Sequence, residues 1–412
     1  MNRNETRTIL DGIKVLDLTR IVAGPWCTQS LADMGATVYK VERPAAGDDM
    51  RQIPQVLTKP DGTPSGDSTA FISVNRGKHS ISLDISRPAG QRIVRELAAR
   101  CDVFVENYKG GNLARYGLDY ESIRRVNPGI VYCSITGFGQ DGPLASQPGY
   151  DPIFQAVSGI MSTCGMPAGE PGGGPVRATI PFIDVMTGMT ATTAILGALY
   201  HRKNGGEGQF IDVALLDVAM AAAAVPYGQT YLLTGKAPSL LGNRSALFSP
   251  SNRFPCVGGG YILIQVGNEA QWKRLCVVLQ RSDWLTDPRF ATNEARMSNI
   301  VELHRQLEEM TSARDSHELA AALGAADVPC GPVNSFAEAF DSPQAKHRGI
   351  RMDLDDPVRG PVACVRSPLR FSATPVRYRP VPALGADTAA VLRSELGMDE
   401  EALAALKADK LI

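Results

Sequence analysis

The 412-residue chain has few of the features of a secreted, metal-binding or nucleic-acid-binding protein. Its eight cysteines include no C-x-x-C pair, and its five histidines form no H-x-x-x-H or H-E-x-x-H pattern. We therefore expect free thiols in a reducing cytoplasm and no metal site. With 42 basic and 43 acidic residues, the formal net charge is −1. This balance gives no electrostatic reason to expect nucleic acid or an anionic membrane as a partner.

Long apolar runs are also scarce. The first residues, MNRNETRTIL, are polar and lack the apolar stretch of a signal peptide. No uninterrupted apolar run approaches the roughly 20 residues that span a bilayer. The most apolar segment, LLDVAMAAAAVPYG (215–228), is short and rich in alanine, which predicts a buried helix. The remaining composition is that of a soluble globular protein, and the length favours two domains.

The first third of the chain alternates between strand and helix patterns. GIKVLDLT (12–19) predicts a strand, residues 24–35 a helix that ends at Gly35, and ATVYKVERP (36–44) a second strand. Further strands are expected at 79–85, 102–107 and 130–139, with a helix at 87–101 that begins near Pro88. This order predicts an α/β domain with a doubly wound parallel sheet. The first turn reads TRIVAGP, so the G-x-G-x-x-G fingerprint of dinucleotide-binding proteins is absent.

The pattern changes after about residue 227. NRFPCVGGGYILIQVGN (252–268) predicts a hairpin that turns at its glycines, and amphipathic helices follow it. We therefore expect a large domain over 1–227, a small α+β domain over 228–335, and a return to the large domain over 336–412. The acidic DLDD cluster (353–356) is expected in a solvated hairpin turn.

Asp184 is the only acidic or basic side chain between Arg177 and His201. It lies between strand-like TIPFI and the helix pattern GMTATTAILGALYHR, where aspartate is a favoured helix cap. The same position favours an ionised carboxylate, which a nucleophile requires, and helix N–H groups that stabilise oxyanions. The small residues that follow would allow another chain or a ligand to come close. From the residues alone, the cap and the nucleophile remain alternatives.

Polar side chains follow several of the predicted strands. Arg20 and Arg43 each come after a strand, and Asn107 and Tyr108 follow another. Ligands of open α/β sheets bind at the carboxyl ends of the strands, so these residues suit an anionic ligand. Solvated surface residues are the alternative for each of them. Other cations near predicted strand ends are Arg51, Arg76, Lys78 and Arg115.

Read together, several stretches resemble the family III CoA-transferases, the CaiB–BaiF family. The matching stretches are GIKVLDLTRIVAGP, LADMGATVYKVERPAAGDDMR, NRGKHSISLDI, DVFVENYKGGNLARYGLDY, IVYCSITGFGQDGP, GYDPIFQAVSG, FIDVMTGM, GALYHRKNGGEGQFIDVALLD and VPCGPV. The resemblance covers nearly the whole chain.

The resemblance implies a large split domain with a Rossmann-like sheet, a small domain, and an interlocked, ring-like homodimer. It implies coenzyme A and acyl-CoA as substrates, small carboxylic acids as partners, and no tightly bound cofactor. The aspartate of the segment that matches FIDVMTGM is the nucleophile of the family, which places this role on Asp184. The intermediates would be an acyl–aspartyl anhydride and an aspartyl–CoA thioester.

Further positions carry over from the family one at a time. Those that match contacts to the nucleotide and pantetheine are Arg43, Leu83, Asn107, Tyr108 and Arg115, and Tyr150 and Asp151 match the region lining the thioester. Three departures from the oxalate-using members make oxalate exchange unlikely to be the activity: Val22 replaces a glutamine, and Ser86 and Pro148 replace lysines.

The stretches LDLTRIVAGP and VERPAAGDD look most like the succinyl-CoA-dependent group that acts on dicarboxylates such as glutarate, itaconate, mesaconate or malate. The second carboxylate of such an acid needs a cation, for which Arg20 is the candidate and Arg76 or Arg177 the alternatives. A racemase or epimerase of the same fold is a second hypothesis. It is disfavoured because the family's racemases carry a histidine where Tyr150 stands. A non-catalytic acyl-CoA-binding subunit is the third.

Overall fold

The computed structural model describes residues 7–53 and 55–412, which divide into two compact units. Unit 1 takes the chain up to Ile160, Ala178–Gly235 and Gly349–Ile412, and unit 2 takes Met161–Arg177 and Lys236–Arg348. The boundaries therefore lie at 235/236 and 348/349. The sequence analysis placed them at 227/228 and 335/336, which is 8 and 13 residues earlier in the chain.

The assignment of the glycine-rich segment 161–177 to unit 2 was not anticipated. Its strands β8 (Gly165–Met166) and β9 (Gly174–Pro175) pair with each other. The Gly242 N–H donates to the Gly165 carbonyl at 2.8 Å, and Arg244 forms an ion pair with Glu170 at 2.7 Å. These contacts with residues 70 or more positions away explain why local sequence pattern did not place the segment.

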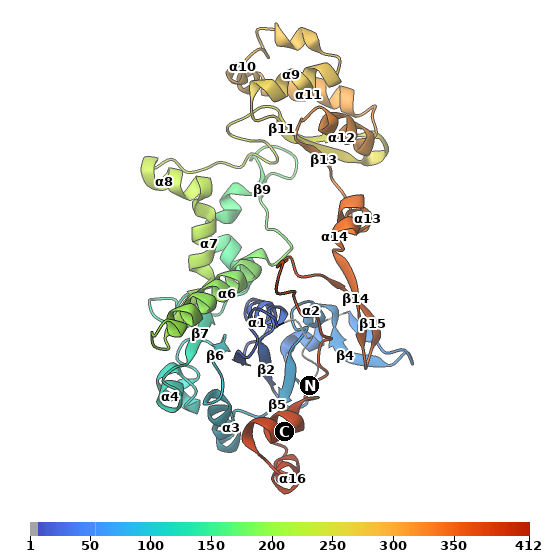
Figure 1. The fold of residues 1–412 in the computed structure, drawn as a ribbon. Coiled ribbons are helices and arrows are strands. Elements are labelled where there is room, and N and C mark those ends of the chain that lie inside the picture. Colours follow the sequence, from blue (N-terminus) through green and yellow to red (C-terminus); the bar gives the residue numbers. More distant parts are fainter. Residues whose placement is uncertain (1–6, 54) are drawn as a thin grey trace. The chain divides into compact units, whose positions relative to one another are not determined.

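Unit 1 is built on a six-stranded sheet in the order β10–β7–β6–β1–β2–β5, and every pair in it is parallel (Figure 1). The strands are β1 (Lys14–Asp17), β2 (Thr37–Glu42), β5 (His79–Ser82), β6 (Val103–Glu106), β7 (Val131–Thr136) and β10 (Phe210–Ala214). The chain winds outward from β1 in one direction and from β6 in the other. The predicted doubly wound α/β fold is confirmed.

Helices cover both faces of this sheet because alternate residues of each strand point to opposite sides. On one face, Val15 joins a core with α1 (Ala23–Asp33), α5 (Asp151–Val157), α6 (Phe182–Lys203) and α7 (Leu215–Ala223). On the other, Leu16 joins a core with α3 (Pro88–Ala98), α4 (Tyr120–Val126), α15 (Thr388–Leu396) and α16 (Glu400–Ala408).

Helix α6 packs closely against α1. A Cβ atom on Gly188 would come within 2.6 Å of the Ala23 carbonyl oxygen, so only glycine permits this approach. Gly188, Ala191 and Thr192 are among the buried residues of α6. The buried small residues after Asp184 therefore bring α6 against a helix of the same unit.

Two expectations about apolar helices need correction. By length and composition alone, α6 is the one described helix apolar enough to cross a bilayer, and its buried residues face α1 and the sheet. The sequence analysis found no such run because Asp184 and several threonines interrupt it. Helix α7 was expected to be buried, but only Leu215, Val218 and Ala219 of it are.

The C-terminal segment covers the outer edge of β5. The Asp387 carboxylate accepts the Ser80 N–H at 2.9 Å, and the Thr388 hydroxyl accepts the Ser82 N–H at 2.9 Å. Beside them lies the hairpin of β14 (Arg351–Asp356) and β15 (Gly360–Val365). Asp356 of the DLDD cluster is buried against Arg359 rather than solvated, because the hairpin turn folds that arginine back onto it.

The smaller elements of unit 1 are β3 (Val56–Thr58), β4 (Pro64–Ser68), α2 (Thr69–Ser73) and α8 (Gln229–Thr234).

Unit 2 has an antiparallel sheet in the order β11–β12–β13, formed by Ser251–Pro255, Tyr261–Gln265 and Cys330–Pro332. Its main helices are α9 (Glu269–Val278), α10 (Asn293–Ser298), α11 (Ile300–Thr311) and α12 (Ser316–Ala325), followed by α13 (Phe336–Asp341) and α14 (Pro343–Arg348). Trp272 and Trp284 stack in its core with ring centroids 5.6 Å apart. The predicted glycine hairpin and α+β character are confirmed.

Candidate active site

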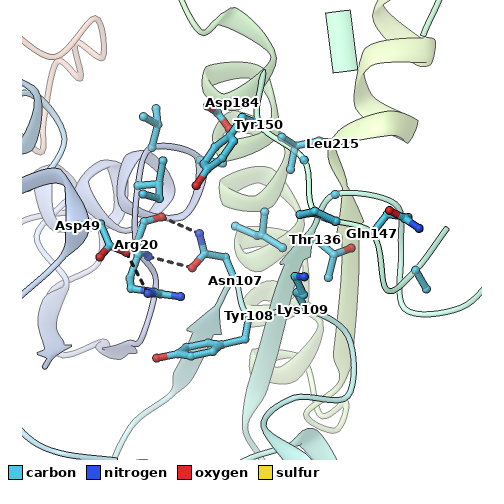
Figure 2. Close-up of a pocket in the computed structure, with 18 residues that line it drawn as sticks. Arg20, Asp49, Asn107, Tyr108, Lys109, Thr136, Gln147, Tyr150, Asp184 and Leu215 are labelled. Atoms are coloured by element: carbon cyan, nitrogen blue, oxygen red, sulfur yellow. Dashed lines mark hydrogen bonds and ion pairs between the residues drawn. The ribbon is translucent and has the colours of Figure 1, made fainter. Parts of the chain in front are cut away.

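A cavity of about 230 Å³ lies in unit 1 at the carboxyl ends of β1, β6 and β7 (Figure 2). Strands β1 and β6 are neighbours from which the chain winds in opposite directions, and this switch point is where open α/β sheets bind ligands. The predicted residues that line it are Arg20, Asn107, Tyr108, Tyr150 and Asp184, joined by Val22 and Pro148, two of the positions that depart from the oxalate-using pattern.

Asp184 is in the first turn of α6, but it does not cap the helix. Helix α6 begins at Phe182, two residues before Asp184, because the strand-like TIPFI does not form a strand. The cap comes from α5 instead: Oδ2 of Asp151 accepts the N–H groups of Ile183 at 2.7 Å and of Asp184 at 3.1 Å. The expected cap role therefore belongs to Asp151, a residue 33 positions away that no local pattern could identify.

The other N–H groups of this helix start are also engaged. The Phe182 N–H donates to the Ile180 carbonyl at 2.8 Å, and the Val185 N–H donates to the Pro181 carbonyl at 3.2 Å. The expectation that the start of α6 would offer free donors to an oxyanion is therefore wrong. Neither of these two hydrogen bonds involves the carboxyl group of Asp184.

The protonation of Asp184 also differs from expectation. Its side chain is 9% exposed, and burial, followed by the nearby charge of Asp151, raises its pKa to about 7. Among the described residues, no lysine or arginine forms an ion pair with Asp184 or Asp151. The carboxyl group was expected to stay ionised at pH 7; with this pKa it is ionised in only about half of the molecules.

Asp151 is itself held in place. The Gln155 side chain, one turn further along α5, donates to Oδ1 of Asp151 and to the Ala178 carbonyl, and accepts the Ala178 N–H at 2.9 Å. These bonds join α5 to the segment that leads into α6. Tyr150 precedes Asp151, is 66% exposed, and lies close to Asp184 at the cavity (Figure 2).

Arg20 lies across the cavity from the start of α6 (Figure 2). Its Nη1 forms an ion pair with Oδ2 of Asp49 at 3.0 Å, and its guanidinium lies 5.1 Å from the centre of the Tyr108 ring. Its Nε is buried with no hydrogen-bond partner in the described part of the chain. Arg43 also pairs with Asp49, on the other carboxylate oxygen. Asp49 therefore connects the two arginines that follow β1 and β2.

The remaining predicted positions are divided. The Asn107 amide is bound to the backbone of Arg20, donating to its carbonyl at 2.6 Å and accepting its N–H at 2.9 Å. Leu83 is buried in the core after β5, and its N–H donates to the Glu42 carbonyl at 2.8 Å. Arg115 lies over the Tyr116 ring and does not line the cavity.

Several cavity residues were missed, and several expected cations do not reach it. Asp49, Lys109, Thr136 and Gln147 line the cavity, and only Thr136 carried a signal, because it lies within the predicted strand 130–139 and ends β7 in the structure. Arg51, Arg76 and Lys78 are buried in ion pairs with Glu42, Asp33 and Asp17. In residues 7–53 and 55–412, no group of three or more His, Cys, Asp or Glu side chains could hold a metal ion.

The sequence pattern of the family described as CoA-transferase family III matches residues 10–388. The chain belongs to this family. A succinate–glutarate CoA-transferase of Agrobacterium fabrum is 44% identical over 93% of this chain and 94% of its own. The human succinyl-CoA:glutarate CoA-transferase is 37% identical over 96% and 88%. A crystal structure of a CaiB/BaiF family protein from Brucella suis, 39% identical, superposes with a TM-score of 0.84 over 94% of this chain and all of that one.

The family III assignment makes the chain a transferase that uses CoA thioesters. The cavity at the switch point presents a buried carboxyl group and an arginine.

Proposed function

We propose that this family III CoA-transferase moves CoA from succinyl-CoA to glutarate, with Asp184 as the nucleophile. The observation that carries the proposal is the buried, cation-free carboxyl group of Asp184 in the cavity at the switch point. The names of the relatives supply glutarate and succinyl-CoA as substrates. Itaconate, mesaconate and malate share two carboxylates with glutarate and belong to the same proposal.

The reaction is a series of acyl transfers. Ionised Asp184 attacks the thioester carbonyl of succinyl-CoA, expelling CoA thiolate and forming a succinyl–aspartyl anhydride. The thiolate attacks the aspartyl carbonyl, which gives aspartyl–CoA and free succinate. Glutarate then attacks aspartyl–CoA, forming a second anhydride and releasing the thiolate, which attacks the glutaryl carbonyl to give glutaryl-CoA and regenerate Asp184. Each step exchanges one acyl bond for another and needs no oxidant or reductant.

The environment of Asp184 suits the first step. A carboxylate with a raised pKa is more basic, and hence a stronger nucleophile, than a solvated one. Because the N–H groups of α6 are bound to Asp151 and to carbonyls, another donor must stabilise the oxyanions. We assign this role to the start of α1, which lines the cavity at Val22 and Ala23 and whose first N–H groups have no partner within the helix.

Arg20 is the proposed partner of the second carboxylate of the acid. Its guanidinium faces the cavity, its Nε has no partner, and Tyr108 supports its plane. An arginine can hold a carboxylate through two parallel hydrogen bonds. The pair with Asp49 is partly exposed, so a substrate carboxylate can compete for the same guanidinium.

We further propose a cytoplasmic homodimer. Helices α6 to α8 expose large apolar side chains in unit 1, which include Met189, Tyr200, Val225, Leu232 and Leu233. Val225 is 84% exposed and Leu232 and Leu233 are each 76% exposed. Large apolar side chains exposed in such number favour a protein interface, and a second copy of the chain fits the resemblance.

Transfer of heavy oxygen from the substrate to Asp184 tests the mechanism. Glutarate labelled with oxygen-18 in its carboxylates is incubated with the protein and succinyl-CoA, and the tryptic digest is examined by mass spectrometry. In the proposed sequence the bridging oxygen of the second anhydride remains on Asp184. The tryptic peptide 178–202 contains no other acidic side chain, so label in it reports on Asp184 alone.

The controls and alternatives use the same material. Peptide 204–236, which carries Glu207, Asp212 and Asp217, should stay unlabelled, and label in 178–202 should require succinyl-CoA. Glutaryl-CoA formed without label in peptide 178–202 would retain the transferase and remove Asp184 as the nucleophile. Absence of glutaryl-CoA would remove the proposed substrates, and uptake of solvent deuterium at the α-carbon of a branched acyl-CoA would then favour the racemase.

A further inference from the structure

The loop between β1 and α1, which carries Arg20, is held by side chains rather than by backbone pairing. The Lys40 ammonium donates to the Thr19 carbonyl at 2.8 Å. Oδ1 of Asp48 accepts the Ile21 N–H at 3.2 Å. Lys40 and Asp48 in turn form an ion pair, with Nζ and Oδ2 separated by 2.9 Å. One ion pair therefore grips the backbone on both sides of Arg20.

This loop needs such a grip because its backbone is strained. Ile21 has a φ of +73°, a left-handed conformation that is unusual for any residue other than glycine and most unfavourable for a β-branched one. Strained residues persist only where surrounding contacts enforce them, and they concentrate at functional sites. Here Ile21 itself lines the cavity directly after Arg20.

The same ion pair fixes the partner of Arg20. Asp48 precedes Asp49, and it accepts the Met50 N–H at 3.0 Å while its own N–H donates to Oε2 of Glu42 at 3.0 Å. Both ends of the Arg20–Asp49 pair are therefore connected to Lys40–Asp48. A shift of this buried pair would move the guanidinium and the carboxylate together.

If its only role were to fill the core, apolar side chains could replace this ion pair at a lower cost in free energy. Both side chains are 0% exposed, and burying two charges gains little stability over apolar residues of the same shape. Burial opposes the charge on Lys40, but Asp48, Asp17 and Glu42 outweigh it and raise the lysine's pKa. Lys40 thus stays charged at neutral pH, and the pair makes directed hydrogen bonds that apolar side chains cannot make.

We propose that Lys40 and Asp48 are positioning residues that hold the Thr19–Ile21 backbone so that Arg20 can bind the distal carboxylate of the acid substrate. The inference rests on the proposed function for its substrate. Lys40 and Asp48 do not touch the substrate; they act through the backbone of Arg20 and Ile21.

A mutant cycle between the ion pair and Arg20 tests this role. The variants are Lys40→Met/Asp48→Asn, Arg20→Ala and their combination, and steady-state kinetics are measured with succinyl-CoA and glutarate. We expect the first two to raise the KM for glutarate by about tenfold or more. The combined variant should be no worse than Arg20→Ala, because the pair acts only through Arg20. The dissociation constant of CoA, which has no acyl chain, should stay unchanged.

Arg359→Met/Asp356→Asn is the matched control, since it removes buried ion pairs that do not border the cavity, those of Arg359 with Asp356 and with Asp67. It should leave the KM for glutarate at the wild-type value. A combined effect equal to the product of the separate effects would overturn the proposal, as would a KM in Lys40→Met/Asp48→Asn equal to that of the control. If the double variant does not fold, Asp48→Asn takes its place in the cycle.

Failure of the proposed function has a different signature. If the wild-type protein forms no glutaryl-CoA, the proposed substrates are wrong, and this is known before any variant is compared. Active wild type with an unchanged KM in Arg20→Ala would retain the transfer and overturn the positioning role, because Arg20 would then bind no carboxylate.

Discussion

Unit 1 contains two sets of buried carboxylates that differ in whether a cation lies beside them. Asp17, Glu42 and Asp48, on and after β1 and β2, each form an ion pair or hydrogen bond with a buried lysine or arginine. Asp151 and Asp184, at the junction of α5 and α6, face each other without a cation among the described residues. Both sets lie in the same core unit, so burial alone does not distinguish them.

The pKa values show the consequence. Burial would raise the pKa of Asp17, but Lys78 and Lys40, with hydrogen bonds from Thr19 and Thr28, more than offset it and lower the value. For Asp184, burial and Asp151 act in the same direction and raise the value to about 7. Among the described residues, Asp151 and Asp184 lack a cation, and so does Glu106, whose pKa burial also raises to about 7. Asp184 differs from Glu106 in that it lines the cavity, which makes it the candidate for chemistry.

Replacing Asp184 gives the largest expected effect on activity. Asp184→Asn keeps the shape and removes the nucleophile, so CoA transfer should fall by about three orders of magnitude or more. Glutaryl-CoA formation measures the loss, and calorimetric titration with CoA shows whether binding remains. Asp212→Asn is a suitable control, because burial also raises the pKa of Asp212, which lies outside the cavity. Near-normal turnover in Asp184→Asn would contradict the proposal that Asp184, unlike the carboxylates paired with cations, takes part in the reaction.

Asp17→Asn tests the structural set through stability. The substitution leaves Lys78, whose Nζ lies 3.1 Å from Oδ2 of Asp17, without its carboxylate. Breaking a buried pair in this way costs about 3–5 kcal/mol in the free energy of unfolding. Denaturant titration measures it against Asp353→Asn, an exposed position where little change is expected. A loss at Asp17 no larger than at Asp353 would mean that the buried pairs contribute little.

The same substitution at Asp184 should raise the free energy of unfolding above pH 7, where Asp17→Asn lowers it. Its pKa is about 7 in the folded protein against an ordinary 3.8, so between these values the folded state binds more protons than the unfolded state. The free energy of unfolding therefore falls as pH rises through this range, by a few kcal/mol at most. Asp184→Asn should be more stable than wild type at pH 8 and equal to it below pH 4. Thermal unfolding at both pH values decides, and a less stable variant at pH 8 would contradict the comparison.

The smallest effect is expected for Asp151→Asn. The substitution removes the charge that adds to burial in raising the pKa of Asp184, while an amide oxygen can still accept the N–H groups of α6. Transfer requires ionised Asp184, so the acid limb of kcat/KM should move to lower pH, by less than about one pH unit because burial remains. Asp212→Asn should leave the limb in place. A shift to higher pH would show that Asp151 does not act through its charge.

Local pattern in the sequence was sufficient for much of the fold. Short apolar segments located β1, β2, β6 and β7, Pro88 marked the first residue of α3, and Gly35 ended α1 with a φ of +101°. These signals depend on neighbours within a few residues. The doubly wound parallel sheet followed from the alternation of strands and helices, and Arg20, Asn107 and Tyr108 followed from the strand ends.

The parts that escaped prediction depend on distant contacts. The cap of α6 comes from Asp151, the grip on Ile21 from Asp48, and the burial of Arg76 from Asp33. None of these partners is within five residues of the group it binds. The raised pKa of Asp184 likewise results from what surrounds it in space, which a linear pattern does not contain.

The contact of the C-terminal segment with β5 has a consequence for how the protein is made. Strand β5 ends at Ser82, yet its edge is covered by Asp387 and Thr388, and the Asp84 N–H donates to the Leu411 carbonyl at 2.9 Å. A ribosome delivers the N-terminus first, and an exposed strand edge invites pairing with other chains. The nascent chain must therefore carry an open sheet edge until residues 387 to 411 have been made, and only then can that edge close.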